Sequence, residues 1–266
     1  MNDAFRLGLD VDAINIDILD HGAYADLIAG AIDAGYRHLG CSQIGDTEPI
    51  VRDAIRRSGV DRDELTVATK IHPRDLGHAD VARSADESRQ RLGVEVIDLL
   101  YVHAPKAAYD PAGTLAAFDA LVDRGIVRNV GVAHFDPEQL LEAVERLECP
   151  LYAHQVERHP LLRQRRLLQL AHDHDHWLVA ATPLLRGFVA EIAEVLEVAD
   201  RRGLTPFEVT LAWHHNDPRV ATLAHSQNAA HLRSNLAAGQ LALSPDEQRV
   251  IDGIERSWRL FFQLGT

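Results

Sequence analysis

The sequence predicts an α/β protein folded as one (β/α)8 TIM barrel. Eight short apolar runs alternate with eight helical patterns along the chain, which favours strands and helices in strict alternation. The length of 266 residues suits a single barrel, which needs about 250, so we expect one domain over residues 1–266. A doubly wound open sheet is the alternative. It needs a glycine-rich phosphate loop after the first strand, and Leu9-Asp10-Val11-Asp12 does not provide one.

The expected strands are short and largely apolar, as parallel strands covered on both faces are. They are Phe5–Leu9, Arg37–Gly40, Leu65–Lys70, Val96–His103, Val127–Ala133, Tyr152–Val156, Trp177–Ala181 and Val220–Ala224.

The expected helices begin at start signals such as Asp110-Pro111 and end at glycines such as Gly93 and Gly203. A final helix and a tail with Trp258, Phe261 and Phe262 follow the eighth unit, and we expect the tail to pack onto the barrel. The helical patterns are Tyr24–Ala34, Pro49–Ser58, Asp80–Arg91, Pro111–Arg124, Pro137–Leu147, Arg163–His174, Phe188–Arg202 with Pro206–Asn216, Ala229–Ala238 and Pro245–Ile254.

The net charge of −13 disfavours nucleic acid and anionic membranes as partners. Lysine occurs only at Lys70 and Lys106, which is typical of a halophile or of a GC-rich genome, although a merely acidic protein is equally compatible. The sequence contains no apolar run of about 18 residues and no secretory pattern, so we expect a cytoplasmic protein. Cys41 and Cys149 lie far apart, and we expect no disulfide.

Chemistry in such a barrel lies at the carboxyl ends of the strands. Two side chains at these ends stand out, Lys70 after TVAT and His103 after DLLYV. The alternative is a solvated charge at the rim for Lys70 and a structural histidine for His103. The scarcity of lysine in this chain favours a functional Lys70.

Motifs along nearly the whole chain resemble the aldo-keto reductase family, especially its short-looped prokaryotic and haloarchaeal-type members. They are GAIDAGYRH, ELTVATK, VIDLLYVHAP, TLAAFDALVDRGIVRNVGVAHF, AHQVERHPLL, AHDHDHWLVAATPL, HSQNAAHLRSNLAA and LSPDEQRVIDGIER. The resemblance implies a (β/α)8 barrel that uses NADP(H) to reduce small aldehydes and ketones.

Family members protonate the substrate oxygen with a tyrosine whose pKa a Lys–Asp pair lowers, while a histidine orients the carbonyl. The lysine matches Lys70 and the histidine matches His103. In GYRHLGCSQIGDTE, however, the aspartate position is Gly40 and the tyrosine position is Gly45. We therefore expect a degenerate site, in which Lys70 is unpaired and its pKa is depressed.

The resemblance also assigns the cofactor positions, several of them altered. The nicotinamide-stacking tyrosine becomes Ala181, and the lysine that pairs with the 2′-phosphate becomes His225, so we expect the preference for NADPH to fade. The expected cofactor-binding residues are His134, Gln155, Thr182, Leu184, His225, Ser226, Asn228, Arg233 and Asn235.

Four functional hypotheses follow. The first is a weak NADP(H)-linked oxidoreductase with a small carbonyl or alcohol substrate, active as a monomer or small homo-oligomer. The second is a non-catalytic barrel that binds a nucleotide, a small ligand or a protein partner, because Gly40, Gly45 and Ala181 would widen the mouth. The third, disfavoured for lack of a carboxylate ligand pair, is a metal site of Cys41, His103 and His134. The fourth is a Schiff base at Lys70. We expect no metal.

Overall fold

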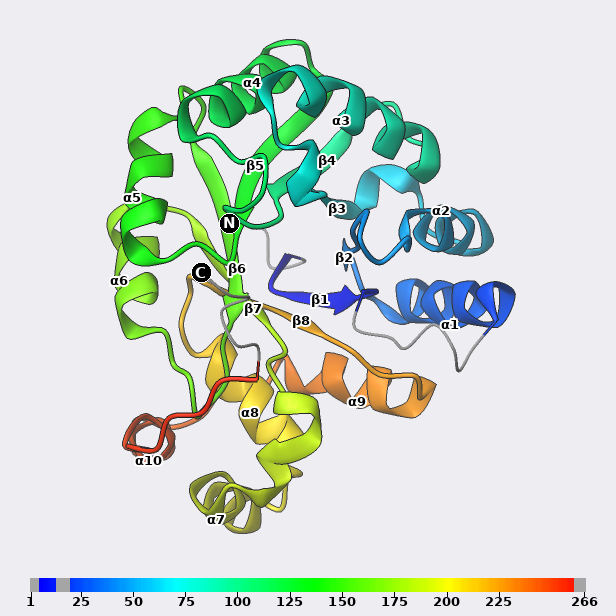
Figure 1. Ribbon diagram of the computed structural model, residues 1–266. Coiled ribbons are helices and arrows are strands. Elements are labelled where there is room, and N and C mark those ends of the chain that lie inside the picture. Colours follow the sequence, from blue (N-terminus) through cyan, green and yellow to red (C-terminus); the bar gives the residue numbers. More distant parts are fainter. Residues whose placement is uncertain (1–4, 13–19, 261–266) are drawn as a thin grey trace.

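The computed structural model describes residues 5–12 and 20–260. Eight strands form a closed barrel in which each strand pairs in parallel with its neighbours in chain order, and β1 closes on β8 (Figure 1). The predicted (β/α)8 barrel is confirmed, and the open sheet is excluded. The strands are β1 (Leu7–Asp10), β2 (His38–Gly40), β3 (Thr66–Ile71), β4 (Ile97–Val102), β5 (Val127–Ala133), β6 (Leu151–Glu157), β7 (Trp177–Ala181) and β8 (Val220–Ala224).

The helices lie outside the strands (Figure 1). Each of the eight predicted strands and each predicted helical region has a counterpart, with ends that differ by a few residues. The α-helices are α1 (His21–Ala34), α2 (Glu48–Arg57), α3 (His78–Leu92), α4 (Pro111–Asp123), α5 (Pro137–Arg146), α6 (Arg165–Asp173), α7 (Ala193–Arg202), α8 (Pro206–His215), α9 (Ala229–Ala238) and α10 (Pro245–Asp252). Short 3-10 helices are η2 (Arg62–Glu64), η3 (Pro73–Asp75) and η4 (Leu185–Glu191).

The predicted helix starts and stops act as sequence reasoning expects. The Asp110 side chain accepts a hydrogen bond from the backbone of Gly113 at the start of α4. Gly93 and Gly203 close α3 and α7 with left-handed backbone angles, φ of 66° and 63°, which glycine adopts without strain.

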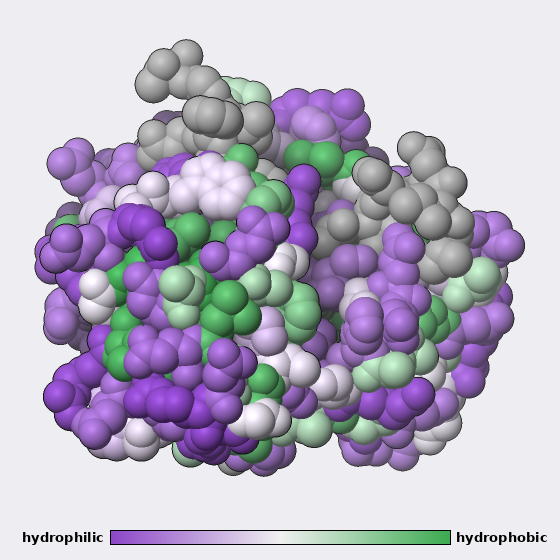
Figure 2. Space-filling view, turned by 90° about the horizontal axis from the view of Figure 1, so that it is seen from below, coloured by the Kyte–Doolittle hydropathy of each residue, from purple (hydrophilic) through white to green (hydrophobic). Residues whose placement is uncertain are grey.

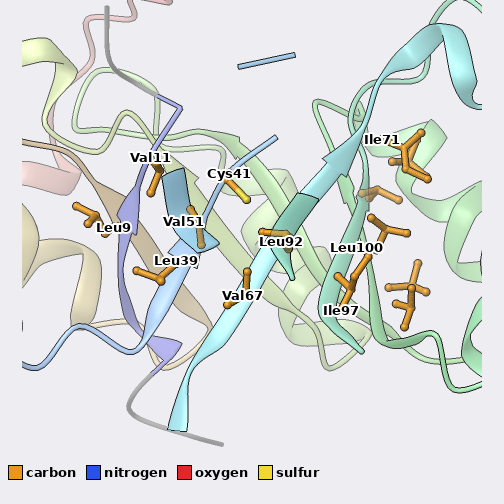
Figure 3. Close-up of a cluster of buried hydrophobic side chains, with 14 of the residues drawn as sticks. Leu9, Val11, Leu39, Cys41, Val51, Val67, Ile71, Leu92, Ile97 and Leu100 are labelled. Carbon is orange, nitrogen blue, oxygen red and sulfur yellow. The ribbon is translucent and has the colours of Figure 1, made fainter. Parts of the chain in front are cut away.

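Alternate residues of each strand face opposite sides of the barrel wall. Leu9 and Val11, with Leu39 and Cys41 after them, belong to the core between the strands and the outer helices (Figure 3). A second cluster fills the barrel interior, with Ala68, Leu99, Tyr101 and Leu223 among its members. Because Leu9 and Val11 face the helices, Asp10 and Asp12 face the interior.

The region predicted as one helix over Phe188–Arg202 differs in the structure. It divides into η4 and α7, and Arg186 and Gly187 within η4 have positive φ angles of 52° and 98°, which an α-helix cannot continue through.

The tail contacts the barrel as predicted, as far as the structure describes it. The Trp258 ring lies edge-on to Phe188, with ring centroids 5.3 Å apart, and the backbone N–H of Leu260 donates to Glu157 at 2.6 Å. Phe261 and Phe262, which carried part of the prediction, lie outside the described residues.

Hydrophilic residues dominate the face seen from below in Figure 2, and hydrophobic residues form smaller, interrupted patches on it. Within the described residues, no helix is both long and apolar enough to cross a membrane.

Candidate active site

An ion pair between β1 and β3 lies at the carboxyl end of the barrel. The Lys70 ammonium donates to the Asp12 carboxylate at 2.9 Å and to the backbone carbonyl of Cys41 at 3.0 Å. Asp12 follows β1 by two residues, and Lys70 is the penultimate residue of β3. The side chain of Lys70 is 5% exposed and that of Asp12 is 20% exposed. The lysine of this pair is therefore almost completely excluded from solvent, whereas the aspartate is accessible from the mouth of the barrel.

The expectation that Lys70 lacks an acidic partner is wrong. Burial alone would lower the pKa of Lys70, but the charges of Asp12 and then Asp10 outweigh burial, so the pKa is raised above its usual value. The expected depression does not occur, because the carboxylate of Asp12, at the end of β1, pairs with Lys70. Lys70 is therefore a stable ammonium at neutral pH, which also disfavours the Schiff-base hypothesis, since that chemistry requires a neutral amine.

Asp12 is held as a carboxylate. Burial would raise its pKa, but Lys70 and the hydrogen bonds from Thr47, Lys70 and Ser42 lower it below the usual range. The Thr47 hydroxyl donates to Oδ1 of Asp12 at 2.6 Å, whereas Lys70 binds Oδ2. Each carboxylate oxygen thus has a fixed donor, which sets the orientation of the group.

Asp10 lies one step deeper on the same face of β1 and behaves differently. Its Oδ1 accepts the backbone N–H of Asp12 at 3.1 Å. Burial is the main cause that raises the pKa of Asp10 to about 7, and repulsion from Asp12 is the second. The attraction of Lys70 acts in the opposite direction but is smaller. The two aspartates therefore form a pair in which Asp12 carries the charge and Asp10 holds a proton for much of the time near neutral pH.

The glycines at positions 40 and 45 do not widen the mouth, contrary to expectation. A Cβ added at Gly40 would lie 2.9 Å from the side chain of Leu223, which already fills that space. A Cβ added at Gly45 would lie 2.7 Å from Oδ1 of Asp12. A side chain at position 45 and the carboxylate of Asp12 therefore compete for the same place.

His103 and His134 follow adjacent strands, and their rings stack with centroids 6.2 Å apart. Burial is the main cause that lowers the pKa of His103 to about 3, and the charge of Lys70 is the second. The imidazole of His103 is therefore neutral at neutral pH. Nδ1 of His103 is buried and has no hydrogen-bond partner among the described residues. The charge of Lys70 thus reaches His103, which is a neutral ring.

Cys41 does not join the histidines, contrary to the metal-site hypothesis. Its side chain packs in the core between strands and helices, near Val11 and Val51 (Figure 3), and its thiol donates to the carbonyl of Ala68 at 3.2 Å. Over residues 5–12 and 20–260, no group of three or more His, Cys, Asp or Glu side chains could hold a metal ion.

The predicted nicotinamide-side residues lie at or just beyond the carboxyl ends of β5, β6 and β7. The backbone N–H of His134 donates to the carbonyl of Gln155 at 2.9 Å, which fixes the two positions side by side. Gln155 is buried, and its Oε1 has no partner within the described part of the chain. Thr182 has a positive φ of 53°, and Leu184 precedes η4, so both lie where the chain turns sharply after β7.

The predicted phosphate-side residues follow β8 and enter α9. The Ser226 hydroxyl accepts the backbone N–H of Asn228, which caps α9, while Arg233 is exposed on that helix. His225 and Asn235 are less available. The ring of His225 hydrogen-bonds to the carbonyl of Asp10 at 3.1 Å and burial lowers its pKa, and Asn235 is buried.

Sequence reasoning missed Asp12 and Asp10, because the β2 motif drew attention to positions 40 and 45. The available signal was two aspartates at alternate positions at the end of an apolar strand, where both face the interior. It also gave no role to Lys106, whose Nζ is buried without a partner among the residues described.

Comparisons with known proteins show the family to which the chain belongs. Residues 19–256 match the model of the Aldo/keto reductase family. A 9,11-endoperoxide prostaglandin H2 reductase of Trypanosoma cruzi is 32% identical, over 91% of this chain and 86% of its own. A 2,5-diketo-D-gluconic acid reductase B of Corynebacterium is 33% identical, over 89% of this chain and 85% of its own.

Solved structures share the fold. A putative 2,5-diketo-D-gluconic acid reductase B superimposes with a TM-score of 0.87 at 27% identity, over 93% of this chain and 86% of its own. A Gox0644 variant in complex with NADPH superimposes with a TM-score of 0.84 at 24% identity, over 93% of this chain and 88% of its own. The extent of the family match and of these relatives leads to one conclusion: the chain belongs to the aldo-keto reductase family.

Proposed function

We propose that the protein is an NADP(H)-linked oxidoreductase of small aldehydes and ketones in which Lys70 replaces the family's tyrosine as proton donor. The observation that carries this proposal is the hydrogen-bonded ion pair of Lys70 and Asp12, 2.9 Å across. A buried ammonium at a strand end persists only when it is paired, and a carboxylate from another strand pairs it here. The charged centre of the site is thus retained although Gly40 and Gly45 carry no side chains.

The proposed roles follow from the protonation states. Bound NADPH would supply a hydride to the carbonyl carbon, and the chain must then protonate the oxygen. Lys70 can donate this proton, because Asp12 and the carbonyl of Cys41 occupy two of its three N–H groups. The neutral ring of His103 can orient the carbonyl by a hydrogen bond but cannot serve as a cationic acid at neutral pH.

Catalysis should be slow, because the raised pKa of Lys70 makes it a weak acid. General acid catalysis contributes a factor of about 10²–10⁴, so we expect an activity below that of a tyrosine-bearing relative by a factor in that range.

The residues present fit the cofactor at two points. The buried, unpartnered Oε1 of Gln155 can accept a hydrogen bond from a carboxamide. Ser226, Asn228 and the start of α9 suit a phosphate group, and Arg233 offers a cation beside them. Since His225 is neutral and bound to β1, the preference for NADPH over NADH rests on Arg233 alone among the predicted phosphate-side residues.

The test is NADPH oxidation with a panel of small aldehydes and ketones at low and high salt. We expect measurable turnover that falls to the buffer rate in the Lys70→Ala, His103→Ala double variant. Asp46→Asn is the matched control. Asp46 is exposed on the loop between β2 and α2, and its left-handed backbone, φ 50°, suits asparagine. A wild-type rate no better than that of the double variant would end the proposal.

A non-catalytic barrel remains the second candidate, favoured by the absence of an acidic side chain at positions 40 and 45. Titration calorimetry separates the two. Heat on adding NADPH or NADH without turnover on any substrate would identify a nucleotide-binding barrel. No heat with either nucleotide would favour a protein or small-ligand partner.

A further inference from the structure

The mouth of the barrel holds a carboxylate, an ammonium and a neutral imidazole. Asp12 is the more exposed member of the ion pair: 20% of its side chain is accessible to solvent, compared with 5% of the side chain of Lys70. The Thr47 hydroxyl fixes Oδ1 and Lys70 fixes Oδ2, and with Ser42 as a third donor one of the four lone pairs of the carboxylate stays free. A substrate that enters the mouth therefore meets a carboxylate of fixed orientation.

These groups suit a reaction other than hydride transfer. Asp12 is an ionised carboxylate at neutral pH, and its partly exposed oxygens can accept a proton from a substrate in the mouth. An ammonium and a neutral imidazole are hydrogen-bond donors that stabilise developing negative charge on oxygen. A carboxylate base beside a neutral histidine is the arrangement used for proton abstraction next to a carbonyl on another barrel.

We propose that this site also catalyses proton transfer at the carbon next to a carbonyl, in small α-hydroxy aldehydes and ketones, without any nicotinamide. Asp12 takes the proton from the α-carbon, and the C–H electron pair forms a carbon–carbon double bond as the carbonyl oxygen becomes an oxyanion. Lys70 and His103 hold this enediolate oxygen by hydrogen bonds. Asp12 then returns the proton to the neighbouring carbon, while the hydroxyl proton moves between the two oxygens, so that an aldose and a ketose interconvert.

The structure supports the fixed placement of the base. Oδ1 of Asp12 lies 2.7 Å from the place of a Cβ at residue 45, so a tyrosine there would displace the carboxylate. The acid that suits carbonyl reduction and the base that suits enolisation therefore exclude one another in this space. The reaction consumes no oxidant or reductant, so its outcome does not depend on the proposed oxidoreductase function.

The test is deuterium exchange in the absence of any nucleotide. Dihydroxyacetone and glyceraldehyde are incubated with the protein in D₂O, and proton NMR follows the loss of α-proton signals and the interconversion of the two compounds. We expect exchange above the buffer rate, reduced about 100-fold or more in Asp12→Asn. Asp46→Asn, which changes an exposed carboxylate outside the site, should match the wild type.

The outcomes are distinct. Wild-type exchange at the buffer rate, or exchange that survives Asp12→Asn, would overturn the proposal. If Asp12→Asn does not fold, as circular dichroism would show, His103→Phe decides, because loss of the hydrogen-bond donor should slow exchange at least about tenfold. Trapping of dihydroxyacetone on Lys70 by borohydride would indicate an enamine route and also overturn it. NADPH oxidation, measured separately, judges the oxidoreductase proposal alone.

Discussion

The pair of Lys70 and Asp12 should stabilise the fold as well as the site. Asp12→Ala would leave the ammonium of Lys70, 5% exposed, with the carbonyl of Cys41 as its remaining hydrogen-bond acceptor among the described residues. Removing one partner of a buried pair costs about 3–5 kcal/mol. Two features reduce this cost here: Asp12 is partly exposed, and Asp10 can ionise once its negative neighbour is gone. We therefore expect a loss of about 2–3 kcal/mol in the free energy of unfolding.

A double-mutant cycle isolates the interaction from these side effects. Lys70→Met alone leaves the Asp12 carboxylate with Thr47 and Ser42 as donors, so it should cost less than Asp12→Ala. The double variant removes both charges, and apolar replacement of a buried pair is often nearly neutral. The expected coupling is about 1.5–2 kcal/mol, measured by urea unfolding at neutral pH. The control cycle is Arg83 and Asp80, both 50% exposed, which should show no measurable coupling.

The reasoning is refuted if Asp12→Ala costs no more than a change at the exposed control pair, or if the two effects simply add. Either result would mean that Lys70 is hydrated or paired elsewhere. The salt dependence gives a second criterion, because a buried pair is screened much less than an exposed one. The coupling should persist in high salt.

Three further predictions concern the same site. The pKa of Asp10 is about 7 in the folded protein and 3.8 in the free group, so between these pH values the native state binds more protons than the unfolded state. The stability of the wild type therefore falls as the pH rises through this range. Urea unfolding should show that the free energy of unfolding of Asp10→Asn exceeds that of the wild type by up to about 2–3 kcal/mol between about pH 5 and pH 8. Gly45→Tyr should destabilise the protein by about 1–3 kcal/mol through overlap with Asp12, and Asp12→Ala added to it should relieve the overlap, so that the two changes are not additive. The ring signals of His103 should show no titration by NMR between about pH 5 and pH 8, because its pKa is about 3, and a midpoint within that range would contradict its neutral role.

The sequence predicts the barrel because the signal is periodic and repeated. Trp177–Ala181 is a continuous apolar run and Val127–Ala133 ends in one, VGVA, and the structure has both strands at the predicted bounds. The division of Phe188–Arg202 was not predicted because it depends on left-handed backbone angles at Arg186 and Gly187. Arginine rarely adopts such an angle, so its presence in the sequence does not indicate one.

The site was predictable only in part, because matching the sequence to the family motifs treats each strand separately. Lys70 and His103 match their motifs in register. The partner of Lys70 comes from β1, whose inner face reads Gly8, Asp10, Asp12. Only the closed barrel brings the end of β1 against β2 and within reach of β3. A contact between strands far apart in the chain carries no local pattern.

Gly40, Gly45 and Asp12 are best understood together. With Asp12 in place, Lys70 needs no carboxylate at position 40, where Leu223 fills the space. With Asp12 in place, a side chain at position 45 would force the carboxylate to move, since its Cβ would lie 2.7 Å from Oδ1. A buried and unpaired Lys70 would be energetically costly, and Asp12 pairs it here. We infer that the ion pair of the site depends on the carboxylate at the end of β1, which occupies the space that a side chain at position 45 would need.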